Sequence, residues 1–230
     1  MLFIFSFLLI GKFSLFEMIN VMLKHSIFVF LLSISIKIYK NKIKNTGLKV
    51  IEVIILLSID QIIKIILINS EYIKFQILKN TLYFETYFNK FGSFFGALFN
   101  YKFNNLIVVI IISLIFLIFV EIFRFVKKYN KMTGYFYISF TFIFTGLISS
   151  LSDKIFYKET IDYIYFFPLF HCDLKDLYLL LFIPIILVEF LTNESARYNL
   201  KSRASIKELF CFIEKDIKYI FTKLKIFLDR

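Results

Sequence analysis

The sequence is poor in the residues that form metal centres and disulfides. Its 230 residues include two cysteines, Cys172 and Cys211, and two histidines, His25 and His171. They show neither the CxxC nor the HxxxH spacing that accompanies many zinc sites. We therefore expect no metal and no cofactor. We also expect no disulfide, because the topology derived below places the two cysteines on opposite sides of a membrane.

The same scarcity limits the choice of catalytic chemistry. A histidine-activated serine is poorly supported, because no GxSxG-type motif accompanies either histidine. Tryptophan is absent and there are only two prolines, whereas phenylalanine occurs 33 times. Such a bias is typical of an AT-rich genome, and it weakens any match that rests on one short motif.

Acidic residues are outnumbered by basic ones. The chain has 17 Asp and Glu against 28 Lys and Arg, which gives a formal net charge of +11. A nucleic-acid partner would suit that charge, but the basic residues are concentrated between and after apolar runs. This distribution is typical of the positive-inside rule of membrane proteins. We therefore expect no nucleic-acid partner.

Apolar residues dominate what is present. The chain is 59% hydrophobic and 20% aromatic, with a mean hydropathy of +0.77, whereas soluble domains are about 45–50% apolar. The composition therefore indicates an integral membrane protein. Several spans would consume most of this length, so any active site must lie in or beside them.

Four apolar segments are candidate membrane spans, for which about 20 apolar residues are needed. They cover residues 48–69, 106–125, 134–152 and 177–191. The Lys-dense segments between and around them all fall on one side, which should be the cytoplasm. The sequence thus predicts an all-α polytopic membrane protein with four core spans. Both ends of this core should lie in the cytoplasm.

Two further regions flank the predicted core, which covers residues 48–191. Residues 1–47 form an apolar N-terminal extension that ends in a Lys-rich cytoplasmic segment. An extra span or an interfacial helix is favoured for it over a signal-like leader. Residues 192–230 form a basic cytoplasmic tail, whose apolar positions recur at helical spacing. We expect this amphipathic tail to lie along the inner leaflet.

The first outer loop differs from the spans. Residues 70–104 contain no comparable apolar run, and polar and aromatic side chains alternate around Tyr83, Glu85 and Tyr87. A period of two predicts strands. We expect a small extracytoplasmic β-sheet on the membrane surface, with its aromatic side chains at headgroup level.

Carboxylates beside apolar segments are candidate functional residues, since charge is costly near hydrocarbon. Asp162 and Asp176 flank the second outer loop. If they converge they can share one proton, so that one activates water and the other protonates the leaving amine or the carbonyl oxygen. A capping box with Asp173 as N-cap and Asp176 as the third helical residue is an equally good interpretation.

A second polar pair interrupts the first span. Asp60 and Lys64 are four residues apart, so they share one face of a helix and can form an ion pair. The pair could be self-contained, or it could face a site. Spacing alone leaves both possibilities open.

Four stretches in order carry a family resemblance. Residues 60–64 (DQIIK) are similar to the motif DQxxK, and residues 89–96 (NKFGSFFG) are similar to NxGxxFG. Residues 146–162 (GLISSLSDKIFYKETID) are similar to GxxGNxxDRxxxGxVxDF, and residues 173–176 (DLKD) are similar to the end of FNxAD. Together they resemble the lipoprotein signal peptidase family, the membrane aspartyl peptidases that remove signal peptides from bacterial prolipoproteins. Four motifs on a matching topology are far more specific than any one of them.

The resemblance implies roles for individual residues. Asp162 and Asp176 would be the catalytic dyad. The supporting or substrate-binding residues would be Asp60, Lys64, Asn89, Ser150, Asp153, Lys154 and Asp173. Three of these depart from the family pattern: Ser150 stands in place of Asn, Lys154 in place of Arg, and Asp173 in place of the Asn of FNxAD. Lysine lacks the planar fork of arginine, so the departures affect the polar surroundings of the dyad.

The resemblance also implies a function. We expect an endopeptidase that cuts a diacylglyceryl-modified prolipoprotein before its lipidated cysteine, as a multi-pass monomer in the bacterial cytoplasmic (inner) membrane with an outward-facing active site. One alternative is a divergent relative that binds lipidated peptides without cutting them. A channel or transporter built on Asp60 and Lys64 is disfavoured, because there is no internal repeat and the paired acids lie in an outer loop.

Overall fold

The structure is a computed structural model of the chain, and it describes residues 50–70, 73–89, 91, 101–128, 134–166, 170–192 and 203–228. The predicted N-terminal extension lies outside these residues. So do Gly92 and Gly96 of the second motif.

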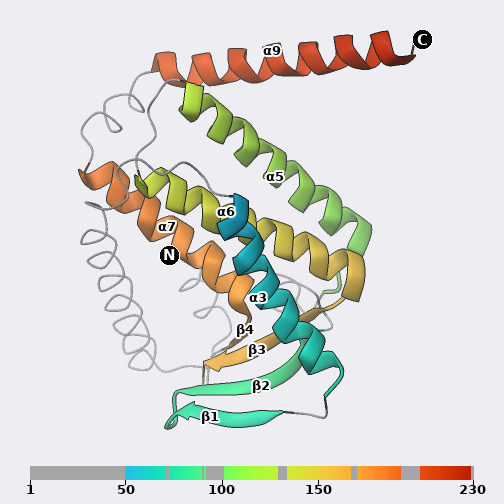
Figure 1. The fold of residues 1–230 in the computed structure, drawn as a ribbon, viewed down its shortest axis with the longest axis vertical. Helices are drawn as coiled ribbons and strands as arrows, with labels where there is room; N and C mark the ends of the chain where they lie inside the picture. Colours follow the sequence, from blue (N-terminus) through green and yellow to red (C-terminus); the bar gives the residue numbers. More distant parts are fainter. Residues whose placement is uncertain are drawn as a thin grey trace.

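Five long α-helices form in the described part of the chain. They are α3 (Val50–Ile68), α5 (Asn105–Lys128), α6 (Gly134–Ser152), α7 (Leu174–Thr192) and α9 (Arg203–Leu228). A short π-helix, η2 (Asp153–Tyr157), continues α6. Helix α6 packs against α3, α5 and α7, and it is therefore the centre of the bundle. Figure 1 shows α6 and α7 running side by side, with α9 across the end of α5.

Within the described residues, two stretches are long and apolar enough to cross a membrane: α5 and the continuous helix Gly134–Tyr157. The outward faces of the helices are apolar too. Leu106 and Leu117 of α5 and Ile51 and Ile62 of α3 are all more than half exposed. Such continuous apolar surface is unfavourable in water and suits a lipid environment. The fold is therefore that of a membrane protein. Helices α3 and α7 form where spans are predicted, and whether they cross the bilayer stays a prediction.

A four-stranded antiparallel sheet closes one end of the helices. Its strands are β1 (Lys74–Leu78), β2 (Leu82–Asn89), β3 (Thr160–Phe166) and β4 (Phe170–Cys172), in the order β1-β2-β3-β4. The strands predicted from the alternation in the first outer loop are confirmed. The second outer loop adds β3 and β4 to the same sheet.

The register of this sheet brings two distant motifs together. Tyr87 pairs with Asp162, and Asn89 pairs with Thr160. Residues directly opposite one another in an antiparallel pair have closely spaced side chains. The end of β2 is therefore fixed beside the candidate catalytic aspartate of β3.

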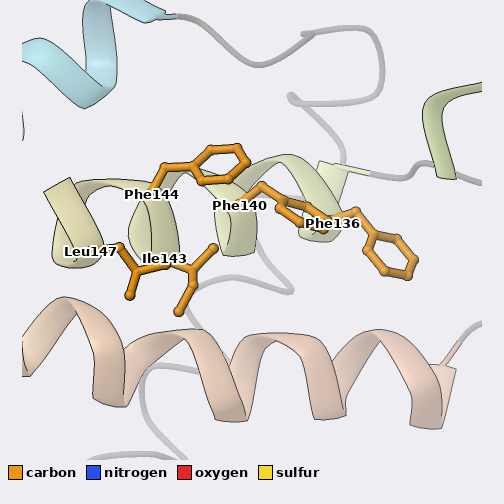
Figure 2. Close-up of a cluster of buried hydrophobic side chains, with 5 residues drawn as sticks. All are labelled: Phe136, Phe140, Ile143, Phe144 and Leu147. Carbon is orange, nitrogen blue, oxygen red and sulfur yellow. The ribbon is translucent and has the colours of Figure 1, made fainter. Parts of the chain in front are cut away.

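The main apolar core surrounds α6. Its buried side chains are Phe136, Phe140, Ile143, Phe144 and Leu147, which pack against residues of α5 and α7. Figure 2 shows Ile143 and Leu147 directed toward the neighbouring helix and Phe144 on the opposite side of α6. Phe140 and Phe144 both make edge-to-face contacts with Phe123 of α5. Such aromatic contacts fix the distance and rotation of the helices.

The predicted amphipathic helix of the tail is confirmed as α9. It contacts the end of α5 through an ion pair between Asp216 and Arg124 and through an edge-to-face contact of Phe212 with Phe125, whose ring centroids are 5.7 Å apart. Lys128 lies over the same Phe212 ring at 5.1 Å. The tail helix is thus attached to the bundle, and its position along the inner leaflet stays a prediction.

Candidate active site

Asp162 and Asp176 converge where the sheet meets the helices. Asp162 lies in β3 and Asp176 in the first turn of α7. Together with Asp173, each offers a carboxylate oxygen, and these oxygens lie within 4.8 Å of one another. Asp162 is buried, whereas Asp176 is partly exposed. The hairpin of β3 and β4 followed directly by α7 therefore brings the two predicted catalytic carboxylates together.

The capping box predicted at the start of α7 is also present. The Asp176 N–H donates to Oδ1 of Asp173 at 3.2 Å, and the Asp173 N–H donates to Oδ2 of Asp176 at 3.4 Å. These reciprocal bonds satisfy two backbone donors at the helix start. The cap and the carboxylate pair are thus compatible, because the cap holds one oxygen of Asp176 in place beside Asp162.

Lys64 is the centre of a buried ion cluster. Its Nζ lies 2.7 Å from Oδ2 of Asp60, 2.8 Å from Oδ2 of Asp153 and 2.7 Å from Oδ2 of Asp173. All four side chains are fully buried. A lysine ammonium has three donors, and here each has a carboxylate partner. The pair of Asp60 and Lys64 is therefore not self-contained, since it ties α3 to η2 and to the cap of α7.

Asp60 is held by further partners that sequence analysis did not assign to the site. The Ser149 hydroxyl donates to its Oδ2 at 2.5 Å, and the Tyr163 hydroxyl donates to its Oδ1 at 2.8 Å. Tyr163 in turn accepts from the N–H of Leu174 at 3.3 Å. Burial and the neighbouring Asp60 raise the pKa of Tyr163 far above its usual value, so the phenol stays neutral and remains a donor. Its position directly after Asp162 is the signal that could have identified it.

Gln61 completes the link between α3 and the end of α6. Its Nε2 donates to Ser149 at 3.1 Å and to Asp153 at 3.3 Å, and its Oε1 accepts from the Tyr157 hydroxyl at 3.3 Å. Gln61 belongs to the DQxxK stretch, so the motif itself marked it.

Lys175 is a second buried lysine that sequence analysis did not single out. Its Nζ lies 3.1 Å from Oδ2 of Asp153 and bonds to Oδ2 of Asp173. Its side chain is only 6% exposed. Two ammonium groups, from α3 and α7, therefore share the carboxylates of Asp153 and Asp173.

Asn89 lies directly against the candidate dyad. Its Nδ2 donates to Oδ2 of Asp162 at 3.3 Å, and its Oδ1 accepts from the Phe91 N–H at 3.1 Å. The amide is thus oriented by the backbone and donates to the carboxylate. This contact stabilises the charged form of Asp162.

The surroundings of Asp162 and Asp173 give these two carboxyl groups different proton affinities. Burial raises the pKa of Asp162 to about 6, and Asp173 raises it too, while Lys175, Asn89 and Lys64 lower it. Burial alone would raise the pKa of Asp173 as well, but Lys175 and Lys64 more than offset this and hold it below its usual value. Asp173 is therefore ionised near neutral pH, whereas Asp162 titrates close to it.

Comparison with known proteins identifies the family. The family model described as signal peptidase (SPase) II matches residues 52–192, which is more than half of the chain. The chain belongs to the signal peptidase II family. It is therefore a peptidase of lipoprotein processing, as the four motifs predicted. No curated protein matches the chain significantly.

Solved structures share the fold. One bacterial membrane enzyme, determined by the in meso method at 2.3 Å, has a TM-score of 0.52 and 17% identity, over 63% of this chain and 90% of the other. A second, determined at 1.9 Å, has a TM-score of 0.51 and 18% identity, over 63% and 92% of the two chains. The core thus shares its fold with these bacterial membrane enzymes, over nearly the whole length of both.

The departures from the family motifs lie at different places in this signal peptidase II site. Asp173 is part of the ion cluster. Ser150 instead donates to the Gly146 carbonyl of its own helix at 2.8 Å. Lys154 is buried, interacts electrostatically with Asp153 and Asp162, and its carbonyl accepts from Asn105 at 3.2 Å. Of the three altered positions, Asp173 therefore changes the charge beside the dyad most directly.

The acidic cluster also has a spacing that a divalent cation could bridge. Asp162, Asp173 and Asp176 each offer one oxygen within 4.8 Å of the others. Asp173, however, is already bound by the ammonium groups of Lys64 and Lys175. A carboxylate neutralised in this way is a poor further ligand, so the arrangement suits proton sharing better.

The two remaining reactive side chains near the site are inert at neutral pH. Cys172 is buried, and burial together with the carboxylate of Asp176 raises the pKa of its thiol. His171 stacks on Tyr165 and Tyr87, with ring centroids 4.1 and 4.4 Å away, and burial lowers its pKa. The histidine is thus a neutral member of an aromatic stack.

Proposed function

We propose that this chain is an aspartic endopeptidase that removes the signal peptide from diacylglyceryl-modified prolipoproteins, with Asp162 and Asp176 as its catalytic pair. The observation that carries the proposal is the approach of these two carboxylates within a chain of the signal peptidase II family. Asp162 is buried on strand β3, and Asp176 is partly exposed at the start of α7. This arrangement lets a substrate approach the pair from one side.

The chemistry needs one proton shared between the two carboxyl groups. The ionised carboxylate takes a proton from water, and the water oxygen attacks the carbonyl carbon of the scissile peptide bond. The protonated partner gives its proton to the carbonyl oxygen. When the tetrahedral intermediate collapses, the carbon–nitrogen bond breaks and the amine leaves with the proton of the pair. One hydroxyl of the intermediate returns its proton to the other carboxylate, which restores the singly protonated pair.

The proposed topology places this reaction at the outer surface of the bacterial cytoplasmic membrane. Helices α3, α5, α6 and α7 would span the bilayer, with the sheet and the dyad outside and α9 on the inner side. The positive-inside distribution of lysines supports this orientation. Residues 1–47 and the tail 192–230 would then be additions to a peptidase core at residues 48–191. We expect the enzyme to act as a monomer in contact with membrane lipid.

Cleavage of a synthetic diacylglyceryl lipopeptide by the purified chain in detergent tests the proposal. Asp162→Asn and Asp176→Asn should each lower kcat by about 10²- to 10⁴-fold, because each removes one partner of the proton transfer. Asp216→Asn on the distant α9 is the matched control and should cleave normally. A parental chain that binds the lipopeptide but never cuts it, across a pH series, would instead establish the non-cleaving alternative.

A further inference from the structure

The site holds a positive charge that the family motif does not require. In the alignment with FNxAD, Lys175 stands at the alanine and Asp173 at the asparagine. The two departures are therefore a new cation and a new anion two residues apart. In the structure their side chains bond to each other, and both are buried. The pair adds no net charge to the site, but it introduces an ammonium group close to Asp162 and Asp176.

Lys175 reduces an excess of negative charge in its surroundings. The charged groups gathered here among the described residues are the carboxylates of Asp60, Asp153, Asp162, Asp173 and Asp176 and the ammonium groups of Lys64, Lys154 and Lys175, with Lys102 acting on Lys154 from the surface. The neutral neighbours include Asn89, Tyr157, Tyr163, Cys172 and Tyr178. Carboxylates are in excess even with every lysine charged. Losing Lys175 would leave more negative charge in a space from which water is largely excluded, and such charge is costly.

Lys175 also acts on both members of the dyad. Its ammonium group interacts electrostatically with Asp162 and Asp176 as well as with Asp173 and Asp153. Its direct bonds go to Asp173 and Asp153. The lysine therefore touches the structural carboxylates and acts at longer range on the catalytic ones.

We propose that Lys175 is a positioning residue of the peptidase site: its ammonium group neutralises Asp173 and Asp153, and so keeps a single shared proton on Asp162 and Asp176 at neutral pH. The inference rests on the proposed peptidase function and adds a residue to it. Asp173 belongs to the same arrangement, because its buried negative charge requires the ammonium group of Lys175.

Three variants test this role through the pH profile of kcat/KM. Lys175→Ala should move the acidic limb of the profile upward by about one pH unit or more, because a nearby opposite charge shifts a carboxyl pKa by about that much. Asp173→Asn should move the limb downward, and asparagine keeps the helix cap. The double variant Asp173→Asn with Lys175→Ala should lie between the two single variants. Lys175→Arg, which keeps the charge, should retain the parental midpoint.

Loss of activity without a change of midpoint in Lys175→Ala would contradict the proposal, since that is the result of a purely structural role. If Lys175→Ala does not fold, the same loss of charge is measured by comparing the acidic-limb midpoint of the double variant with that of Asp173→Asn. Equal midpoints in that comparison would also overturn the proposal.

Direct titration separates this inference from the proposed function. Carbon-13 NMR of aspartate carboxyl groups, with the Asp162 signal assigned by its loss in Asp162→Asn, reports its protonation without any substrate. Lys175→Ala should raise the midpoint of that signal even if the parental chain cuts no lipopeptide. An inactive parental chain would therefore refute the function, while an unmoved Asp162 midpoint would refute the role of Lys175.

Discussion

The continuous helix of α6 and η2 is stabilised in opposite ways at its two ends. From Phe136 to Leu147 its buried side chains are mainly apolar and pack against α5 and α7. From Ser149 to Asp153 the buried groups are a hydroxyl and a carboxylate, held by Asp60, Gln61 and Lys64. The apolar end is stabilised by close packing of side chains, whereas the polar end requires a hydrogen-bond or ion-pair partner for each buried polar group.

This difference decides how each end responds to change. An apolar core of the right size tolerates volume-conserving swaps, usually at less than about 1.5 kcal/mol. A buried ion cluster does not, because removing one partner leaves the others charged and without water. The predictions below set the two ends against each other.

Lys64→Met should have the largest effect. It leaves three fully buried carboxylates without their common ammonium group, so we expect a loss of about 3–5 kcal/mol of stability. Thermal unfolding in detergent measures it. Leu147→Met at the apolar end is the control and should cost less than about 1.5 kcal/mol, because it conserves side-chain volume. Equal melting temperatures for the two variants would show that the ends do not differ as described.

Gly146→Ala tests the boundary between the two ends. A Cβ at this position would lie 2.7 Å from the Leu179 side chain and 3.3 Å from the Lys175 carbonyl of α7. Overpacking typically costs about 1–3 kcal/mol, partly offset by the better helix propensity of alanine, about 1 kcal/mol. We expect a lower melting temperature and reduced cleavage, because α7 carries Asp176. Adding Leu179→Ala should relieve the contact, so that the double variant is more stable than the sum of the single effects.

Asn89→Ala should have the smallest effect and should be seen in the pH dependence alone. Asp162 already has a pKa raised to about 6, and the donor of Asn89 opposes that rise. Without it, the acidic limb of kcat/KM should move upward by about half a pH unit. Asn105→Ala is the matched control, because its amide donates to the neutral carbonyl of Lys154. A midpoint that moves equally in both variants would contradict a specific contact with Asp162.

The same pKa fixes how Asp162 contributes to stability. Since the folded-state value lies above that of an ordinary aspartate, the folded protein binds this proton more tightly than the unfolded chain does. The contribution of Asp162 therefore favours the folded state at low pH and is lost as pH rises through about 6. Asp173, whose pKa is held below its usual value, contributes in the opposite sense.

Much of the core was predictable because its patterns are local. Apolar runs gave α5 and α6, alternation around Tyr83 gave β2, and the spacing of Asp173 and Asp176 gave the cap of α7. The hydroxyls of α6 were less predictable. Ser139 and Thr145 bond to carbonyls four residues earlier in their own helix, whereas Ser149 reaches across to α3. Nothing in the sequence distinguishes these serines and threonines, because the choice depends on which face meets another helix.

The sequence by itself determined the membrane-protein character, the helices and the family, since composition, periodicity and ordered motifs are properties of the chain alone. Only the tertiary structure decided that Lys64 serves three carboxylates, that Tyr163 and Ser149 hold Asp60, and that Lys175 joins the cluster. These partners lie up to about a hundred residues apart, as with the 103 between Tyr163 and Asp60. Electrostatic interactions depend on the distance between the groups and on their burial, and the separation of two residues in the sequence gives neither quantity.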